Sequence, residues 1–201
     1  MDGELMKILL LSSNENMCDS WRRYFQGVED IEILCEDLTA FKNIYEYDCI
    51  ATPANSYGLM DGGFDLAVTD VFGVGLMKRV QKYIIDNYHG EQPVATSFII
   101  DINENQKLIH TPTMRVPQKI KDPYVIYQCM RTTLLCALNN NVNKIIIPAF
   151  GGECGFIDYD IIARMMKAAY VQINSNRNRI NWDLVDSWNT MLNEFTGVDK
   201  G

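Results

Sequence analysis

One stretch of the sequence, residues 48–67, constrains the fold more than any other because it joins three kinds of local structure. It reads DCIATPANSYGLMDGGFDLA: an apolar run, a turn-rich segment with the Gly62-Gly63 pair, and a helix start near Phe64. Backbone N–H groups are unpaired at a helix start, and glycine lets a ligand approach the main chain closely. The stretch therefore predicts either a turn that binds a phosphate or sugar, or a plain strand-to-helix turn whose glycines serve geometry alone.

Two further apolar runs predict buried strands. Residues 6–12 and 144–149 are continuous apolar segments bounded by polar residues, which is typical of central strands buried on both faces. A second glycine-rich segment, residues 150–156, directly follows the later run. Because ligands in open α/β sheets lie beyond the carboxyl ends of strands, we expect both glycine loops to face one crevice.

Helical and extended patterns alternate along the rest of the chain. Apolar residues at helical spacing predict helices over residues 17–25, 76–88, 123–139, 158–173 and 182–195. Shorter runs predict strands at 31–35, 93–101 and 107–110, the last two joined as a hairpin, and two prolines predict a loop over 111–122. We expect the last helix to bury a stripe that includes Trp182, Trp188 and Phe195. This alternation indicates an α/β fold with a largely parallel or mixed sheet covered on both faces.

A length of 201 residues suits one compact domain, with residues 176–201 expected to form a C-terminal helix packed on residues 1–175. No apolar run approaches the roughly 20 residues that span a bilayer. The longest run, residues 6–11, lacks the length of a signal-peptide core and precedes no small-residue cleavage site. We therefore expect a cytoplasmic protein with no membrane partner.

Charge and metal-ligating residues exclude further functions. The six cysteines show no Cys-x-x-Cys spacing and only two histidines are present, so we expect buried free thiols, no metal site and no cofactor. A net charge of −8 argues against duplex nucleic acid, which is bound through many Lys and Arg contacts to phosphate. An anionic small molecule remains open, because backbone amides can hold it without net positive charge.

Common nucleotide and hydrolase motifs are absent. Residues 12–17, which follow the first strand, contain no glycine, so the Rossmann fingerprint is missing. The P-loop pattern Gly-x-x-x-x-Gly-Lys-Ser/Thr and the nucleophile elbow Gly-x-Ser-x-Gly do not occur either.

Four short segments, taken in order, resemble the macro domain family, whose members bind ADP-ribose. They are EDLT at 36–39, TPANS at 52–56, GGFDLAV at 62–68 and PAFGGECG at 148–155. They are similar to the family's Gly-Asp-Ile-Thr, Asn-Ala-Ala-Asn-Ser and Gly-Gly-Val-Asp-x-Ala-Ile motifs and to its diphosphate loop. Each is weak alone, but their joint order and spacing are specific and cover roughly residues 6–169. The resemblance implies a three-layer α/β/α fold with a mixed central sheet within residues 1–175.

A further segment, HTPTMRVP at residues 110–117, resembles a microbial and phage-like macro-domain subgroup with a Pro-Thr-Met-Arg-Val-Pro sequence there. That likeness implies the same fold and leaves the function of the subgroup open.

The resemblance implies a role for each matched residue. Asp37 would accept a hydrogen bond from the adenine amino group, and Asn55 would hold the distal ribose hydroxyls. The Gly62-Gly63 main chain would pack against that ribose and the phosphates, and the later glycine loop would wrap the diphosphate with its N–H groups. The implied ligand contacts are Asp37, Leu38, Asn55, Gly62, Gly63, Arg115, Pro148, Phe150, Gly151, Gly152, Cys154, Gly155 and Phe156.

Several of these residues have plain structural alternatives. Asp37 could cap a helix, Asn55 could bond its own backbone in a turn, and Arg115 could pair with a surface carboxylate instead of a phosphate. Cys154 is expected to be a buried thiol and not a nucleophile, and His110 a packed histidine at a strand end.

Glu153 departs from the family pattern. It stands where the family generally has glycine in the diphosphate loop, and it adds a Cβ and a negative charge beside a dianion. Either its side chain points to solvent, or the ligand differs from ADP-ribose.

Three functions remain open: an enzyme that releases ADP-ribose from a modified protein, an ester or a 1″-phosphate; a module that binds ADP-ribose or a related NAD-derived nucleotide; and an interaction protein with a decayed pocket. Only Asp65 discriminates, because it matches the aspartate near the distal ribose in the hydrolytic branch of the family, where Asn55 would position the sugar. Its alternative role is to stabilise a helix dipole. The expected partners are a small nucleotide and, for an enzyme, an ADP-ribosylated protein.

Overall fold

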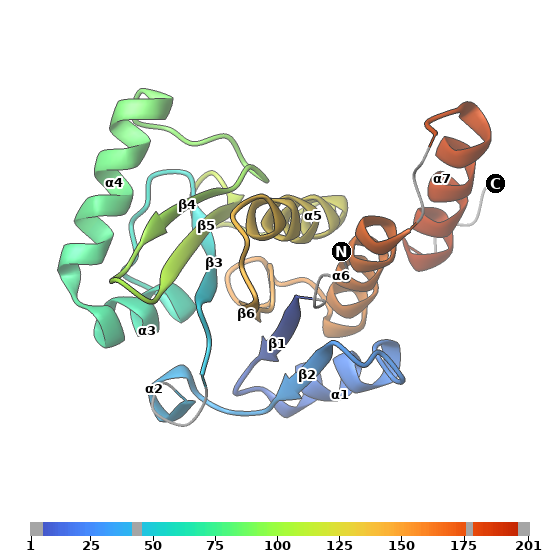
Figure 1. The fold of residues 1–201 in the computed structure, drawn as a ribbon, viewed down its shortest axis with the longest axis horizontal. Coiled ribbons are helices and arrows are strands. Elements are labelled where there is room, and N and C mark those ends of the chain that lie inside the picture. Colours follow the sequence, from blue (N-terminus) through green and yellow to red (C-terminus); the bar gives the residue numbers. More distant parts are fainter. Residues whose placement is uncertain (1–5, 42–45, 176–178, 197–201) are drawn as a thin grey trace.

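The computed structural model describes residues 6–41, 46–175 and 179–196, which form a six-stranded sheet with helices on both faces (Figure 1). The strands are β1 (Lys7–Leu11), β2 (Ile31–Leu34), β3 (Cys49–Asn55), β4 (Phe98–Asp101), β5 (Lys107–Met114) and β6 (Lys144–Pro148). The helices are α1 (Glu15–Tyr24), α2 (Leu38–Phe41), α3 (Gly63–Phe72), α4 (Val74–Tyr88), α5 (Tyr124–Asn139), α6 (Tyr159–Asn174) and α7 (Trp182–Thr196). The predicted α/β class with a mixed sheet is confirmed.

Alternate residues of the central strands enter two separate cores. Ile8 and Leu10 of β1 pack with α1, α5 and α6 on one face of the sheet. Leu9 and Leu11 pack with α2, α3 and α4 on the other face, together with Ile146 of β6. Burial on both faces explains why these strands read as continuous apolar runs.

The strand order β2-β1-β6-β3-β5-β4 determines where a ligand can bind. Strand β6 pairs in parallel with β1 on one side and with β3 on the other, and only the β4–β5 pair is antiparallel. The carboxyl ends of β1, β6 and β3 therefore lie at one edge of the sheet. Both glycine-rich loops begin at that edge, as the sequence predicts.

Strand β5 is longer than the sequence predicts. The two prolines favour a loop from residue 111, but β5 continues to Met114 and pairs with β3 as far as Asn55. Strand β4 reaches only the Phe98–His110 pair, so no strand adjoins Pro112 on that side; its carbonyl accepts a hydrogen bond from the Ala95 N–H instead. The missing proline N–H therefore removes no ladder hydrogen bond. The loop prediction is wrong for residues 111–114.

Strand β4 is shorter than the predicted range of 93–101. Before it, the Thr96 N–H donates to the Pro93 carbonyl at 3.3 Å, and Ala95 adopts a φ of 61°. This turn ends the extended run early, because a left-handed residue cannot continue a strand. The predicted hairpin with β5 is confirmed.

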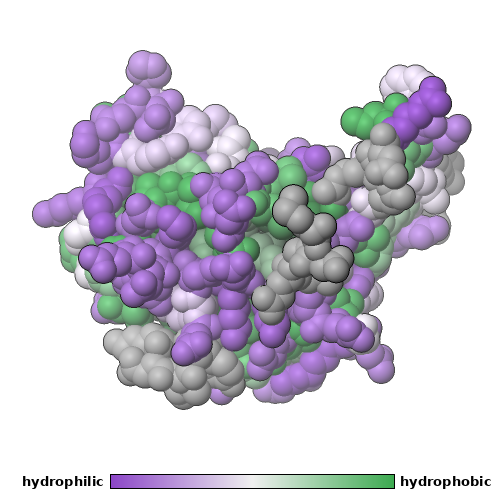
Figure 2. Space-filling view, viewed as in Figure 1, coloured by the Kyte–Doolittle hydropathy of each residue, from purple (hydrophilic) through white to green (hydrophobic). Residues whose placement is uncertain are grey.

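Helix α7 packs along α6 and projects from the rest of the molecule (Figure 1). The Trp188 Nε1–H donates to the Ser175 hydroxyl at 3.3 Å, and Phe195 is partly buried against the core. Trp182 is 80% exposed, so its predicted place in a buried stripe is wrong. Figure 2 shows apolar patches among the hydrophilic residues on this face of the molecule, and one of these patches lies on the projecting helix. The predicted boundary at residue 176 falls on residues that the structure does not describe.

Two further predictions can be compared with the described ranges. None of their helices is long and apolar enough to cross a membrane. All six cysteines are free; Cys18, Cys49 and Cys129 are buried, but Cys154 is exposed, so the expectation of a buried thiol at that position is wrong.

Asp48 joins the amino ends of three strands. Its Oδ2 accepts hydrogen bonds from the Asn143 N–H at 2.8 Å and from the Asn143 Nδ2 at 3.2 Å, and its Oδ1 accepts from the Lys144 N–H at 2.8 Å. Its carbonyl accepts from the Lys107 N–H at 2.9 Å. The carboxylate thus holds β3 against the start of β6, at the edge of the sheet opposite the glycine loops.

Removing this carboxylate should destabilise the fold. We expect Asp48→Ala to lower the free energy of unfolding by about 3 kcal/mol, because three donors lose a charged acceptor. Urea unfolding followed by circular dichroism measures the change. Asp86→Ala is the matched control: Asp86 forms an exposed 2.8 Å ion pair with Lys82, and its loss should cost less than about 0.5 kcal/mol. Equal effects of the two variants would contradict the proposed role of Asp48.

Candidate ligand-binding site

A cavity of about 300 Å³ lies at the carboxyl edge of the sheet. Its walls come from the loops that follow β1, β3 and β6 and from the first turn of α3, with Thr113 and Met114 of β5 along one side. Both glycine-rich segments of the sequence therefore line the same cavity, as predicted.

The loop after β6 forms one wall and is tightly folded. The Ile157 N–H donates to the Gly151 carbonyl at 3.2 Å, and the Gly155 carbonyl accepts from the Ile120 N–H at 3.0 Å. A Cβ at Gly155 would lie 2.5 Å from the Gly151 carbonyl oxygen, and Gly151 itself has a φ of 80°. Glycine is therefore required at both ends of this loop, and the main chain of residues 151–155 lines the cavity.

The amino end of α3 forms the opposite wall. Gly62 is the N-cap residue and provides no side-chain cap, and Gly63 begins the helix with a φ of 54°. Both glycines line the cavity, followed by Phe64 and Asp65. The positive end of the helix dipole, with N–H groups that no side chain caps, therefore faces the cavity.

Asp65 is the most perturbed titratable group in the site. It is only 6% exposed, it lines the cavity, and its Oδ1 has no hydrogen-bond partner among the described residues. Burial first, and then the negative charges of Glu153 and Asp61, raise the pKa of this carboxyl to about 7, while the Thr52 hydroxyl acts to lower it. A carboxyl group that titrates near neutral pH can act as a general acid or base.

Glu153 reaches across the cavity. A Cβ built on Gly63 would lie 1.8 Å from Glu153 Oε2, so the carboxylate rests against the first residue of α3. The side chain does not simply point away into solvent; it places a negative charge at the helix terminus and near Asp65. Of the two alternatives that the sequence raises, the structure does not show a side chain directed simply to solvent; a ligand that differs from ADP-ribose stays a prediction.

Asn55 lies on the cavity wall but is engaged in a turn. Its Oδ1 accepts from the Tyr57 N–H at 3.0 Å and the Leu59 N–H at 3.3 Å, while its Nδ2 donates to the Leu59 carbonyl at 2.8 Å. These contacts match the alternative role as a turn residue. One of the two Nδ2 protons is used, so a ligand would have to take the other.

Asp37 and Leu38 lie outside the cavity lining. Asp37 Oδ1 accepts from the Thr39 N–H at 2.8 Å and from the Thr39 hydroxyl at 2.5 Å, which lowers the pKa of the Asp37 carboxyl. Leu38 is buried in the core beneath α3 and α4. These contacts match the alternative in which Asp37 caps the short helix α2.

The remaining predicted residues divide between the cavity and its surroundings. Pro148, Gly152 and Cys154 line the cavity, whereas Phe150 is buried in the core and Phe156 is 75% exposed with a φ of 51°. Arg115 also lies outside the lining. Its Nε and Nη2 donate to the Glu91 carboxylate at 2.7 and 3.1 Å, and its guanidinium lies over the Tyr57 ring.

The residues after β1 form a wall that the sequence analysis missed. Ser12, Ser13 and Asn14 line the cavity, and Asn14 caps α1 by accepting from the Met17 N–H at 3.3 Å. The Asn14 Nδ2 donates to the hydroxyl of Tyr159, another lining residue, at 3.0 Å. The capping signal directly after a central strand could have identified this wall; the place of Tyr159 depends on how α6 packs.

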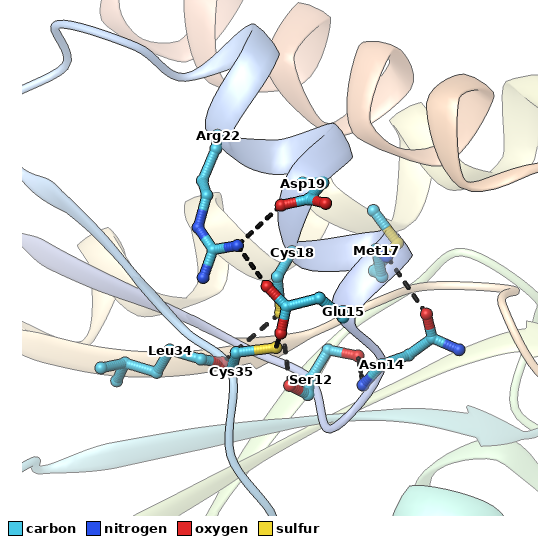
Figure 3. A network of polar contacts seen from close by, with 9 residues as sticks. All are labelled: Ser12, Asn14, Glu15, Met17, Cys18, Asp19, Arg22, Leu34 and Cys35. Atoms are coloured by element: carbon cyan, nitrogen blue, oxygen red, sulfur yellow. Dashed lines mark hydrogen bonds and ion pairs between the residues drawn. The ribbon is translucent and has the colours of Figure 1, made fainter.

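A polar network behind this wall fixes α1 to the loop after β2 (Figure 3). The Glu15 carboxylate accepts from Arg22 Nη1 at 2.6 Å and from Cys35 Sγ at 3.0 Å, and Arg22 also donates to Asp19 at 2.7 Å. Burial, with hydrogen bonds to Cys18 and Glu15, raises the pKa of the Cys35 thiol to about 12. The thiol is therefore a protonated donor at neutral pH, which suits a structural role.

Two features of the described residues limit the chemistry of the site. Their cavity-lining side chains include the carboxylates of Asp61, Asp65 and Glu153 but no Lys, Arg or His. No group of three or more His, Cys, Asp or Glu side chains within the described ranges could hold a metal ion. Any bound anion would depend on main-chain N–H groups and the helix dipole.

Solved structures resemble this fold at low sequence identity. The macrodomain of Mycobacterium tuberculosis DarG shares 16% identity over 65% of this chain and 85% of that chain, with a TM-score of 0.56. The Oceanobacillus iheyensis macrodomain, solved with ADP, shares 19% identity over 74% and 85% of the two chains, with a TM-score of 0.56. A variant of it, solved with ADPR, shares 16% over 77% and 89%, with a TM-score of 0.58. Identity this low shows likeness of fold alone.

Sequence comparison identifies the family. No curated protein sequence matches the chain. The family model described as Macro domain matches residues 51–166, which include β3, α3, β6, both glycine-rich loops and the start of α6. This match covers more than half of the 201 residues. The chain therefore belongs to the Macro domain family.

Proposed function

We propose that the cavity binds ADP-ribose or a related NAD-derived nucleotide. One observation carries the proposal: the amino end of α3, which no side chain caps, and the glycine loop after β6 both line one cavity, where their main-chain N–H groups can meet an anion. Such an arrangement suits a diphosphate. Membership of the Macro domain family, and the structures of macrodomains with ADP and ADPR, support this choice of ligand.

The contacts that we propose follow from the likeness of the matched segments to the motifs of the family. The diphosphate lies along residues 151–155, the distal ribose lies near Asn55 and Asp65, and the adenosine extends past Asn14 toward Asp37. Asp37 Oδ1 is occupied by Thr39, so an adenine amino group would use Oδ2. The cavity volume of about 300 Å³ is at the lower end of the range for small-molecule pockets.

A second candidate function is hydrolysis at the distal ribose, and Asp65 favours it. Its carboxyl group is buried, lines the cavity beside Asn55 and has a pKa near 7, where a general base is most effective. In this proposal Asp65 orients a water molecule and accepts a proton from it as the water oxygen bonds to the anomeric carbon. The bond from that carbon to the attached group breaks, and this group leaves with the electron pair and takes up a proton. The substrate would be an ADP-ribosylated protein, an ester or ADP-ribose 1″-phosphate.

Two finer assignments belong to the same proposal. Residues 110–117 resemble a phage-like subgroup of the family, and three of them, Thr113, Met114 and Pro117, line the cavity. A cytoplasmic location suits six free cysteines and an NAD-derived ligand.

A negative charge placed at Gly152 should weaken binding. A Cβ at Gly152 would make only ordinary contacts of 3.5 Å or more, so Gly152→Ala should keep ADP-ribose affinity within a few-fold. Gly152→Glu should weaken affinity by at least about tenfold through repulsion of the diphosphate. Titration calorimetry measures both variants, and thermal melting checks that both fold. Unchanged affinity in Gly152→Glu would place the ligand elsewhere.

The hydrolase proposal is tested by removing the acid function of Asp65. Asp65→Asn should keep ADP-ribose affinity within a few-fold and lose about a hundredfold or more in turnover. Release of ADP-ribose from a mono-ADP-ribosylated protein, and of phosphate from ADP-ribose 1″-phosphate, measures turnover. Asp86→Asn, on the exposed face of α4 and outside the cavity lining, is the matched control and should remain active. If wild type and Asp65→Asn turn over equally, or neither does, a binding module is the better account.

The buried Asp65 carboxyl should also make stability depend on pH. Its pKa is about 7 in the folded state and 3.8 as the unperturbed value, so between those pH values the unfolded chain loses a proton that the folded chain keeps. Stability contributed by this group is therefore complete below about pH 4, falls as pH rises and levels off above about pH 7. The advantage of Asp65→Asn over wild type should grow across this window by up to about 4 kcal/mol in urea unfolding. A gain that does not change with pH would argue against the raised pKa.

A further inference from the structure

The end of the cavity beside α3 is acidic. Asp61, Asp65 and Glu153 all line it, and the described lining residues include no basic side chain. Arg115 directly follows the lining residue Met114. Its Nε and Nη2 donate to the Glu91 carboxylate, and its guanidinium lies over the Tyr57 ring. A ligand that enters this end of the cavity therefore meets carboxylates without a compensating side-chain cation.

Asp65 gives a second and separate indication that this end binds a ligand. Its side chain is more than nine-tenths buried and lines the cavity, yet Oδ1 has no hydrogen-bond partner among the described residues. A buried polar atom without a partner costs about 1–3 kcal/mol, and folded proteins rarely retain one without a reason. A bound cation beside this carboxyl group would offset part of that cost through its charge.

The two principal carboxylates come from different elements that meet at this end of the cavity. Asp65 belongs to the first turn of α3, while Glu153 comes from the loop after β6 and rests against Gly63. The helix terminus contributes only about half a positive charge, whereas Asp61, Asp65 and Glu153 can contribute three negative charges. The field at this end of the cavity is therefore negative even though a helix dipole points at it.

We infer that this acidic end is a subsite for a cationic group attached through nitrogen to the distal ribose, such as the pyridinium of NAD⁺ or the guanidinium of an ADP-ribosylated arginine. The inference rests on the proposed function, which places the distal ribose beside Asp65. Main-chain N–H groups of residues 151–155 would hold the diphosphate, and Asp65 and Glu153 would flank the positive charge.

The same arrangement disfavours other groups at that position. A phosphate on the distal ribose would add negative charges beside Glu153 and Asp65, so ADP-ribose 1″-phosphate should bind more weakly than ADP-ribose. A divalent metal ion is a competing occupant, but the described residues offer no group of three ligands for it. Addition of a chelator separates this alternative from an organic cation.

The test compares ligands that differ in charge and little in size. Titration calorimetry at pH 8 with EDTA measures the affinity of the wild-type chain for ADP-ribose, NAD⁺ and NADH, since the two nicotinamide rings differ mainly in one positive charge. We expect NAD⁺ to bind about tenfold more tightly than NADH. Glu153→Gln and Asp65→Asn should each reduce this ratio severalfold. The control Asp86→Asn, on the exposed face of α4, should leave the ratio unchanged.

A second comparison distinguishes the two sources of the cation. ADP-ribosyl-agmatine carries the guanidinium of an ADP-ribosylated arginine, and an ADP-ribosylated serine peptide is its neutral counterpart. Preference for either cationic ligand over its neutral counterpart supports the subsite. The stronger of the two preferences identifies which ligand provides the cation.

The outcomes separate this inference from the proposed function. Binding of ADP-ribose with no preference for either cationic ligand would overturn the subsite and leave the proposed function standing. Binding of ADP-ribose 1″-phosphate as tightly as ADP-ribose, or a preference for NAD⁺ that appears only without EDTA, would also overturn the subsite. Failure of every nucleotide to bind would overturn both.

Discussion

Because β1, β6 and β3 run parallel and are buried on both faces, their carboxyl ends must lie at the same edge of the sheet. Every wall of the cavity depends on that arrangement: Asn14 follows β1, the turn at Asn55 ends β3, and residues 149–155 follow β6. Asp48 holds β3 and β6 together at the opposite edge. The position of the site therefore depends first on the direction of the strands and only then on particular side chains.

Main-chain groups and side chains make opposite electrostatic contributions to this cavity. The amino end of α3 and the glycine loop provide N–H groups, which favour an anion. Glu153 and Asp65 place carboxyl groups among them, and the charge of Glu153 raises the cost of ionising Asp65. A nucleotide with a diphosphate and a nearby positive charge would satisfy both contributions, whereas a simple anion would satisfy only the first.

The sequence predicted most elements because their local patterns agree with their environment. Continuous apolar runs identified β1 and β6, and helical spacing identified α5 and α6. The errors lie where contacts between distant parts of the chain determine the structure. Pro112 continues β5 because no strand adjoins it on the side of β4, and Trp182 is exposed because α7 projects from the rest of the molecule. The partners of Asn55 and Arg115 also depend on the folded turn and on Glu91, so composition and spacing could not reveal them.

The tight folding of the loop after β6 separates two kinds of position. Gly151 and Gly155 cannot carry a side chain without a clash, so they maintain the shape of the loop. Glu153 and Cys154 lie between them, are exposed and line the cavity. Substitutions at these middle positions can accumulate without changing the backbone. Related chains that keep the two glycines could therefore differ in the charge of the ligand that they accept after one substitution in this loop, without a change of fold.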